Sequence, residues 1–214
     1  MNYKVLSMAT EEKYISDLTE IRSMMERSTR FLSLTGWSGI MAGVYALAGS
    51  FLAYRIISAE GSGLIPLLVP TGQLSGLNEL ILLAFAVLIF ALGTAVILSR
   101  LKTQKSGERL WNPAARRLVF NLAVPLVTGG IFIFILVANG LTGLIAPASL
   151  IFYGLALLNA SKFTFEELKY FGIIEIILGL LATYYFEFGL FFWALGFGIM
   201  HIVYGIYMHL KYEK

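Results

Sequence analysis

The sequence contains no cysteine, so it offers neither a disulfide framework nor a thiolate metal site. Charged residues are also scarce: they make up 14% of the 214 residues, whereas 58% are hydrophobic. A soluble globular protein is about 45–50% apolar and about 25% charged. With a mean hydropathy of +0.79, the chain has too little polar surface for a water-soluble globule, and its composition predicts a protein that folds in lipid.

Long apolar runs provide the expected membrane spans. A hydrocarbon core about 30 Å thick needs about 20 apolar residues per helix, and a spanning segment must satisfy its own backbone hydrogen bonds. We therefore expect an all-α membrane protein whose residues 34–210 form a six-transmembrane-helix bundle, with a cytoplasmic tail at 211–214. The expected spans are about 34–57, 77–99, 117–138, 142–160, 170–186 and 189–209.

The segment that precedes the first span, 1–33, is mixed in charge and is expected to be cytoplasmic. Within it, residues 11–32 place apolar side chains on one helical face, which predicts an amphipathic helix outside the bilayer core. Such a helix can dock a partner protein, lie on acidic lipid or pack beneath its own bundle. The first residues lack the regions of a signal peptide, so we expect the first span to be retained.

The basic residues are distributed very unevenly. Six of the sixteen Lys and Arg residues lie between Arg100 and Arg117, which separate the second and third expected spans. If the amino terminus is cytoplasmic, fifteen of the sixteen lie on the cytoplasmic side and only Arg55 lies opposite. This asymmetry predicts that both termini are cytoplasmic. The net charge of +3 then follows from topology and does not indicate a nucleic-acid partner.

The stretch Met25 to Gly39, MERSTRFLSLTGWSG, resembles the segment that leads into the first span of an uncharacterised family of small six-span bacterial proteins. The resemblance implies a multi-pass protein of the bacterial inner (plasma) membrane. It implies no activity.

Two ionisable side chains, Glu175 and His201, fall inside expected spans, where such groups are costly and mark candidate functional sites. Each lies thirteen residues from Phe188 in the expected turn, so both lie roughly 20 Å down their helices at about 1.5 Å per residue. Because both share a face with glycines, we expect them to meet inside the bundle. Tyr153 and Tyr204, each followed by glycine, suggest a repeated helical hairpin and complete the predicted polar centre.

Glu175 and His201 allow two interpretations. They can simply satisfy each other, an interhelical contact on the order of 1 kcal/mol. Alternatively they can bind a proton or another cation, because burial favours a neutral carboxyl whereas a nearby imidazolium favours the charged one. With two histidines and no His-Glu-x-x-His spacing, we expect no catalytic metal, and no cofactor motif is present.

Three residues of the expected bundle resemble an enzymatic arrangement. Ser149, Tyr153 and His201 in a six-span chain resemble the arrangement of rhomboid intramembrane serine proteases, which would imply a dyad of Ser149 and His201. Here the serine stands in APASL instead of the Gly-x-Ser-Gly of rhomboids, and the second span has no His-x-x-x-Asn pattern. We therefore do not adopt this assignment.

Three functions remain from the sequence. The first, which we favour, is non-enzymatic binding, transport or sensing of a small solute or ion through the polar centre between spans five and six. The second is a membrane partner or regulatory subunit whose residues 11–32 and 100–117 dock a cytoplasmic protein. The third, an alternative that we do not adopt, is a rhomboid-like protease. No motif specifies a substrate or an oligomeric state.

Overall fold

The computed structural model describes residues 30–59, 76–107 and 110–213, and this part of the chain contains helices and loops but no strand. The helices are α2 (Gly36–Ala59), α3 (Leu77–Ser106), α4 (Pro113–Ala138), α5 (Ile145–Ala160), α6 (Leu168–Tyr184), α7 (Gly189–Trp193) and α8 (His201–Tyr212). Short turns of 3-10 helix are η2 (Thr142–Leu144), η3 (Ser161–Phe163) and η4 (Phe186–Phe188), and a π-helical segment, η5 (Ala194–Met200), joins α7 to α8. Residues 11–29 of the predicted amphipathic helix lie outside the described residues.

Five segments of the described chain are long and apolar enough to cross a membrane. They are Gly36–Ala59, Leu77–Lys105, Pro113–Ala138, Thr142–Phe163 and Phe186–Tyr212. Helix α6 is shorter, with 17 residues. The expected all-helical fold with several helices of membrane-spanning length and composition is confirmed.

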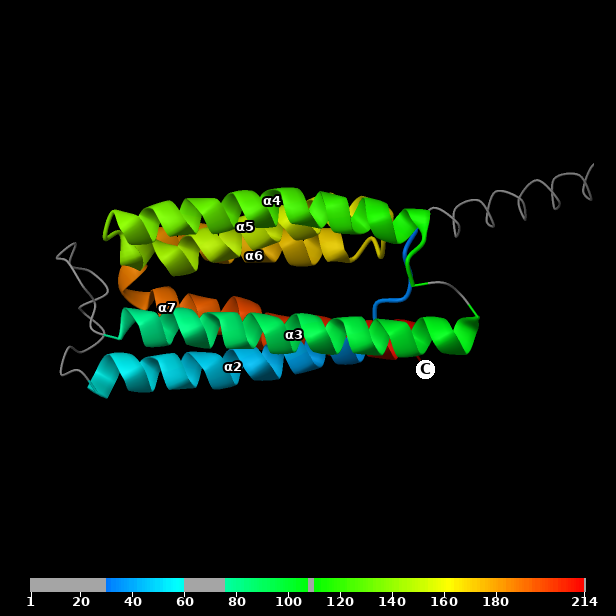
Figure 1. Cartoon of the computed structure of the whole chain (residues 1–214), viewed down its shortest axis with the longest axis horizontal. Helices are drawn as coiled ribbons and strands as arrows, with labels where there is room; N and C mark the ends of the chain where they lie inside the picture. The colour runs from blue at the N-terminus through cyan, green and yellow to red at the C-terminus, as the bar shows by residue number, and fades with distance from the viewer. Residues whose placement is uncertain (1–29, 60–75, 108–109, 214) are drawn as a thin grey trace, which may run out of the picture.

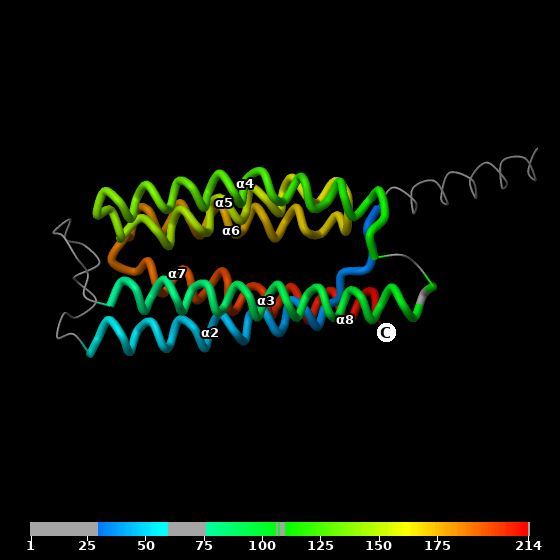
Figure 2. The backbone as a smooth tube through the Cα atoms, viewed as in Figure 1, coloured from blue at the N-terminus to red at the C-terminus, as the bar shows by residue number. Residues whose placement is uncertain are grey.

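Apart from the five-residue α7, the helices form two layers of three (Figure 1). In the α5 layer, α5 lies between α4 and α6; in the α2 layer, α2 lies between α3 and α8. Consecutive long helices alternate in direction along the chain (Figure 2). Helices α2, α4 and α6 therefore run in one direction, and α3, α5 and α8 run in the other. The last helix of the chain, α8, packs beside the first described one, α2.

Glycines allow the helices within each layer to approach closely. An ideal Cβ placed on Gly205 of α8 would lie 2.6 Å from the carbonyl oxygen of Gly36 in α2. In the other layer, a Cβ on Gly154 of α5 would lie 2.6 Å from the carbonyl oxygen of Gly172 in α6. Real Cβ atoms do not fit at such distances, so small residues are required at these membrane-type helix contacts.

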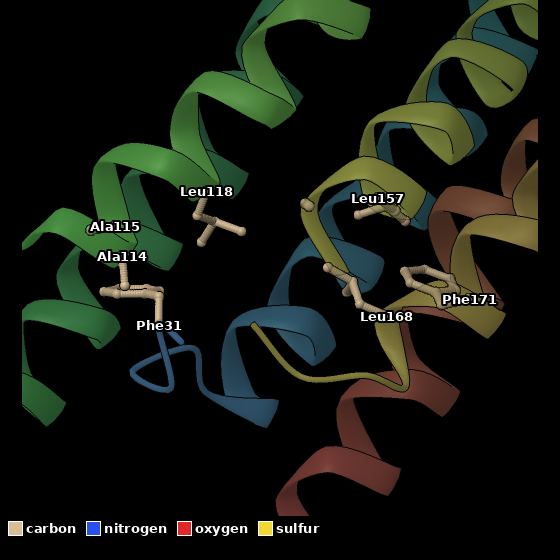
Figure 3. Packing of buried hydrophobic residues seen from close by; sticks show 8 residues of the cluster. Phe31, Ala114, Ala115, Leu118, Leu157, Leu168 and Phe171 are labelled. Carbon is tan, nitrogen blue, oxygen red and sulfur yellow. The ribbon is translucent and has the colours of Figure 1, made fainter. Parts of the chain in front are cut away.

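The chain before α2 connects the two layers at one end of the bundle. The Phe31 backbone N–H donates to the Phe163 carbonyl at 2.7 Å, and the Thr164 hydroxyl donates to the Phe31 carbonyl at 2.6 Å. The Phe31 side chain is 6% exposed and lies beside Ala114 of α4 (Figure 3). It belongs to a buried cluster that consists of Phe31, Ala114, Ala115, Leu118, Leu157, Ala160, Leu168 and Phe171.

The basic stretch between the second and third expected spans is more helical than expected. Residues 100–106 continue α3, and α4 begins at Pro113, where Asn112 caps it by accepting the Ala115 N–H at 2.8 Å. Lys, Arg and Gln are good helix formers, so α3 extends until Gly107, whose φ of 70° ends it. Gly140, with a φ of 71°, lies in the turn between α4 and η2.

Candidate functional site

The structure brings Glu175 and His201 together between the two layers. Glu175 of α6 is fully buried, and His201, the first residue of α8, is 7% exposed. The distance between His201 Nδ1 and Glu175 Oε1 is 3.8 Å. This separation is within ion-pair range but too long for a hydrogen bond.

Both nitrogens of His201 already have hydrogen-bond partners. Nδ1 lies 3.1 Å from the Gly196 carbonyl oxygen, and Nε2 lies 2.8 Å from the Tyr153 hydroxyl of α5. Because a carbonyl oxygen can only accept, Nδ1 carries the proton and donates it to Gly196. In the neutral imidazole Nε2 then accepts from Tyr153. This set of bonds satisfies His201 without Glu175.

The carboxylate of Glu175 is the exception in this site. Among the described residues neither of its oxygens has a hydrogen-bond partner, although the side chain is 0% exposed. Burying an ionised carboxylate without partners is far more costly than burying a neutral one. A buried carboxylate without hydrogen-bond partners therefore needs a proton or another cation to neutralise its charge.

The π-helical segment η5 shapes the wall of the site. π-Helical turns are rare and occur frequently at functional sites. At Gly196 an ideal Cβ would lie 2.5 Å from both Glu175 Oε2 and Leu150 Cδ2. The carboxylate thus packs directly against bare backbone. Nothing in the local letters ALGFGIM distinguishes a π-helix from an α-helix, so sequence reasoning missed Gly196.

Aromatic rings surround the polar pair. The Phe171 ring centroid lies 4.8 Å from that of His201 and 4.7 Å from that of Tyr204, on which it stacks. Tyr204, predicted as a site residue, thus contacts Phe171 instead of hydrogen bonding to the pair. Phe171 itself was missed, although it lies four residues before Glu175 on the same helical face.

The structure does not bring Ser149 to His201. The Ser149 hydroxyl donates to the Ala146 carbonyl of its own helix at 2.8 Å. The hydroxyl that does reach His201 is that of Tyr153. These bonds favour a structural role for Ser149.

A polar cluster lies at the end of the bundle where α8 ends. Glu167 accepts hydrogen bonds from Lys211 and from the Tyr212 hydroxyl, the latter at 2.7 Å, which connects the two layers. Burial raises the pKa of Glu167, but the hydrogen bonds from Lys211 and Tyr212 lower it by more, so the net shift is downward. Lys102, in the predicted docking stretch 100–117, donates to the Leu34 carbonyl at 2.9 Å. This residue is already engaged within the chain.

Metal ligands do not gather in the described part of the chain, where no group of three or more His, Cys, Asp or Glu side chains could hold an ion. The fold and site together define an all-helical protein of membrane-spanning composition with a buried carboxyl and imidazole at its centre. Comparisons with protein-family models, curated proteins and solved structures found no match.

Proposed function

We propose that this protein crosses a membrane six times and binds a small cation, either a proton or a metal cation, at Glu175 for the purpose of transport or sensing. The observation that carries the proposal is the fully buried carboxylate, which lacks a hydrogen-bond partner among the described residues. Ionisable groups at such depth mark ion sites and proton relays in membrane proteins.

The position of the site suggests how binding acts on the protein. Glu175 belongs to the α5 layer, whereas His201 and Gly196 belong to the chain that leads into the α2 layer. A cation that neutralises Glu175 changes the charge at the boundary between the layers. A ligand shifts a conformational equilibrium only through such a difference between states. Occupancy would therefore favour one packing of the layers over another.

Six crossings follow if α6 is counted as a span. Its 17 residues lie at the lower end of the spanning range of about 17–25 residues. We further propose that both termini are cytoplasmic and that the membrane is a bacterial inner membrane. The distribution of Lys and Arg supports the orientation, and the resemblance of residues 25–39 supports the compartment.

Thermal unfolding in detergent tests the proposal. The midpoint is measured across pH and with NaCl or KCl for the wild type, Glu175→Gln and the control Glu166→Gln, which removes an exposed carboxylate. The wild type and the control should show the same dependence on pH or on the added cation, and Glu175→Gln should lose it. If all three proteins respond identically, Glu175 does not bind the cation and the proposal is wrong.

A further inference from the structure

We infer that the cation bound at Glu175 is a proton and that the geometry excludes metal cations. This inference rests on the proposed function and narrows its ligand class. It is carried by three observations, namely the donor set around the carboxylate, the space beside it and the hydrogen bonds of His201.

The donor set is too small for a metal cation. Ca²⁺ takes about 6–8 oxygen ligands, and Mg²⁺ requires near-octahedral coordination. In the described part of the chain the only carboxylate brought to this site is that of Glu175, and no metal-binding group of three side chains is present. The nearby Gly196 carbonyl, which accepts from His201, would add only one further oxygen ligand. A proton, by contrast, needs no ligand beyond the carboxylate oxygen.

The space beside the carboxylate is filled by protein. The position of a Gly196 Cβ lies 2.5 Å from Glu175 Oε2 and 3.3 Å from its carboxyl carbon, so the group rests on the backbone of η5. The same position lies 2.5 Å from Cδ2 of Leu150, a side chain that is 0% exposed. Backbone and an apolar side chain thus occupy this flank of the carboxylate, where a hydrated ion would have to be accommodated. A proton occupies no comparable volume.

The proton is taken up by the Glu175 carboxylate and not by the titratable groups around it. Helix α5 contributes Tyr153 and α8 contributes His201, whereas Tyr204 of α8 stacks on Phe171. Segment η5 and helix α7 contain no titratable residue, and Glu187 of η4 is exposed. The neutral His201 ring is already satisfied because its Nε2 accepts the hydrogen bond from Tyr153. A second proton on the ring would occupy Nε2 and break this bond. Among these groups in the described residues, only Glu175 has buried side-chain oxygens without a hydrogen-bond partner.

Loss of the proton would have a defined structural consequence. The Nδ1–H of His201 now donates to Gly196 at 3.1 Å, and Glu175 Oε1 is 3.8 Å from the same nitrogen. When Glu175 is ionised, its negative charge attracts this N–H and competes with the carbonyl. The Gly196 carbonyl is then released, and η5 loses one side-chain contact. His201 thus acts as a positioning residue that responds to the charge of Glu175.

Infrared difference spectroscopy of the full chain in lipid nanodiscs tests the inference. Spectra at acid and alkaline pH are first compared with N-methylglucamine chloride as the sole salt, and then with NaCl, LiCl or MgCl2 at equal ionic strength. We expect a protonated-carboxyl C=O band whose amplitude falls about tenfold per pH unit above its midpoint. The band should persist in Glu166→Gln, disappear in Glu175→Gln and keep its midpoint in every salt.

A second measurement needs no variant and therefore remains valid if Glu175→Gln fails to fold. Dicyclohexylcarbodiimide adds to protonated carboxyl groups: the acid proton goes to a carbodiimide nitrogen while a carboxyl oxygen bonds to the central carbon. Mass spectrometry should find this adduct, or its N-acylurea rearrangement product, on Glu175 of the wild-type protein. Labelling should decrease with rising pH and should not respond to added NaCl, LiCl or MgCl2.

The outcomes separate this inference from the function on which it rests. If a metal cation abolishes the band and the labelling at constant pH, the proton assignment is wrong but cation binding stands. If the band is absent while His201 becomes protonated, the proton resides on the histidine and the inference is wrong. If neither band nor labelling is found and stability is independent of pH and cations, both the inference and the proposed function fail.

Discussion

The hydroxyl of Tyr153 lies 2.8 Å from Nε2 of His201 and connects the central helix of the α5 layer to the last helix of the α2 layer. The two residues are separated by 48 positions in the sequence. Since Tyr153 donates this bond to the neutral ring, it holds the proton of His201 on Nδ1, the nitrogen that lies 3.8 Å from Glu175 Oε1. Tyr153 thereby sets the orientation of the imidazole toward the carboxylate.

Removal of this hydroxyl should weaken the contact between the layers. Tyr153→Phe keeps the ring, whose centroid lies 5.0 Å from that of Phe197, but leaves Nε2 of His201 without its donor. We expect a loss of unfolding free energy on the order of 1 kcal/mol, the size of an interhelical hydrogen bond in membrane proteins. Reversible unfolding in mixed micelles measures it. The control Tyr170→Phe alters a ring that is 62% exposed and should change little; equal losses would contradict the prediction.

The close glycine contact between α2 and α8 should be intolerant of a methyl group. In Gly205→Ala the new Cβ would meet the Gly36 carbonyl oxygen and the Ile40 nitrogen, both at 2.6 Å, so the helices must separate. We expect a loss of about 1–3 kcal/mol of unfolding free energy, typical of overpacking. Gly93→Ala is the matched control.

Position 93 of α3 has no atom within 4 Å of an added Cβ. Because alanine has the higher helix propensity, the control should be neutral or stabilising by up to about 1 kcal/mol. The same unfolding measurement compares the two variants. If Gly205→Ala is as stable as Gly93→Ala, the α2–α8 contact is not as close as the structure indicates.

The sequence predicts the helices and the proximity of Glu175 and His201 because both depend on local periodicity. Apolar runs give the helix positions, and equal distances from Phe188 place the two side chains at the same depth. The pairing of helices across the chain is not local. Contacts such as that between Gly36 and Gly205 join helices far apart in sequence, and glycines occur on too many faces to specify them.

Other features of the site also escaped sequence reasoning. The Tyr-Gly pattern predicts that Tyr204 belongs to the polar centre, but its ring stacks on Phe171. The π-helical segment η5, which carries Gly196, packs against α2 and α6, helices that lie far from it in the sequence or precede it. Tertiary packing decided both features, and intrinsic propensity carries little information about either.

A pH effect is expected at the last carboxylate of the described chain, Glu213. It accepts hydrogen bonds from His209 Nδ1 at 2.7 Å and from the Gly36 N–H at 2.9 Å, with Lys102 Nζ at 3.7 Å. Burial raises the pKa of Glu213, but the hydrogen bonds from His209 and Gly36 and the attraction of Lys102 lower it by more. The net pKa shift is downward, so the carboxylate stabilises the fold above its unfolded pKa.

This contribution should be lost as the pH falls through the folded pKa of Glu213. We expect Glu213→Gln to be about 1 kcal/mol less stable than the wild type at neutral pH and equally stable in acid. Melting temperatures across pH measure the difference in stability between the two proteins. Both proteins retain Glu175, so any effect of its titration cancels in this difference. Glu166→Gln should show no such gap. A gap for Glu213→Gln that persists unchanged into strong acid would contradict this account.

Six crossings can be tested directly because the chain has no cysteine, so each introduced thiol is the only one. Cysteine is introduced at four exposed positions. Arg116→Cys and Lys162→Cys place it at one end of the bundle, and Asn139→Cys and Glu187→Cys place it at the other. A membrane-impermeant maleimide should label the second pair in spheroplasts and the first pair only in inverted vesicles. Labelling of Lys162→Cys and Glu187→Cys from the same side would show that α6, with its 17 residues, does not span. The carboxyl terminus would then lie outside the cytoplasm, contrary to the distribution of Lys and Arg.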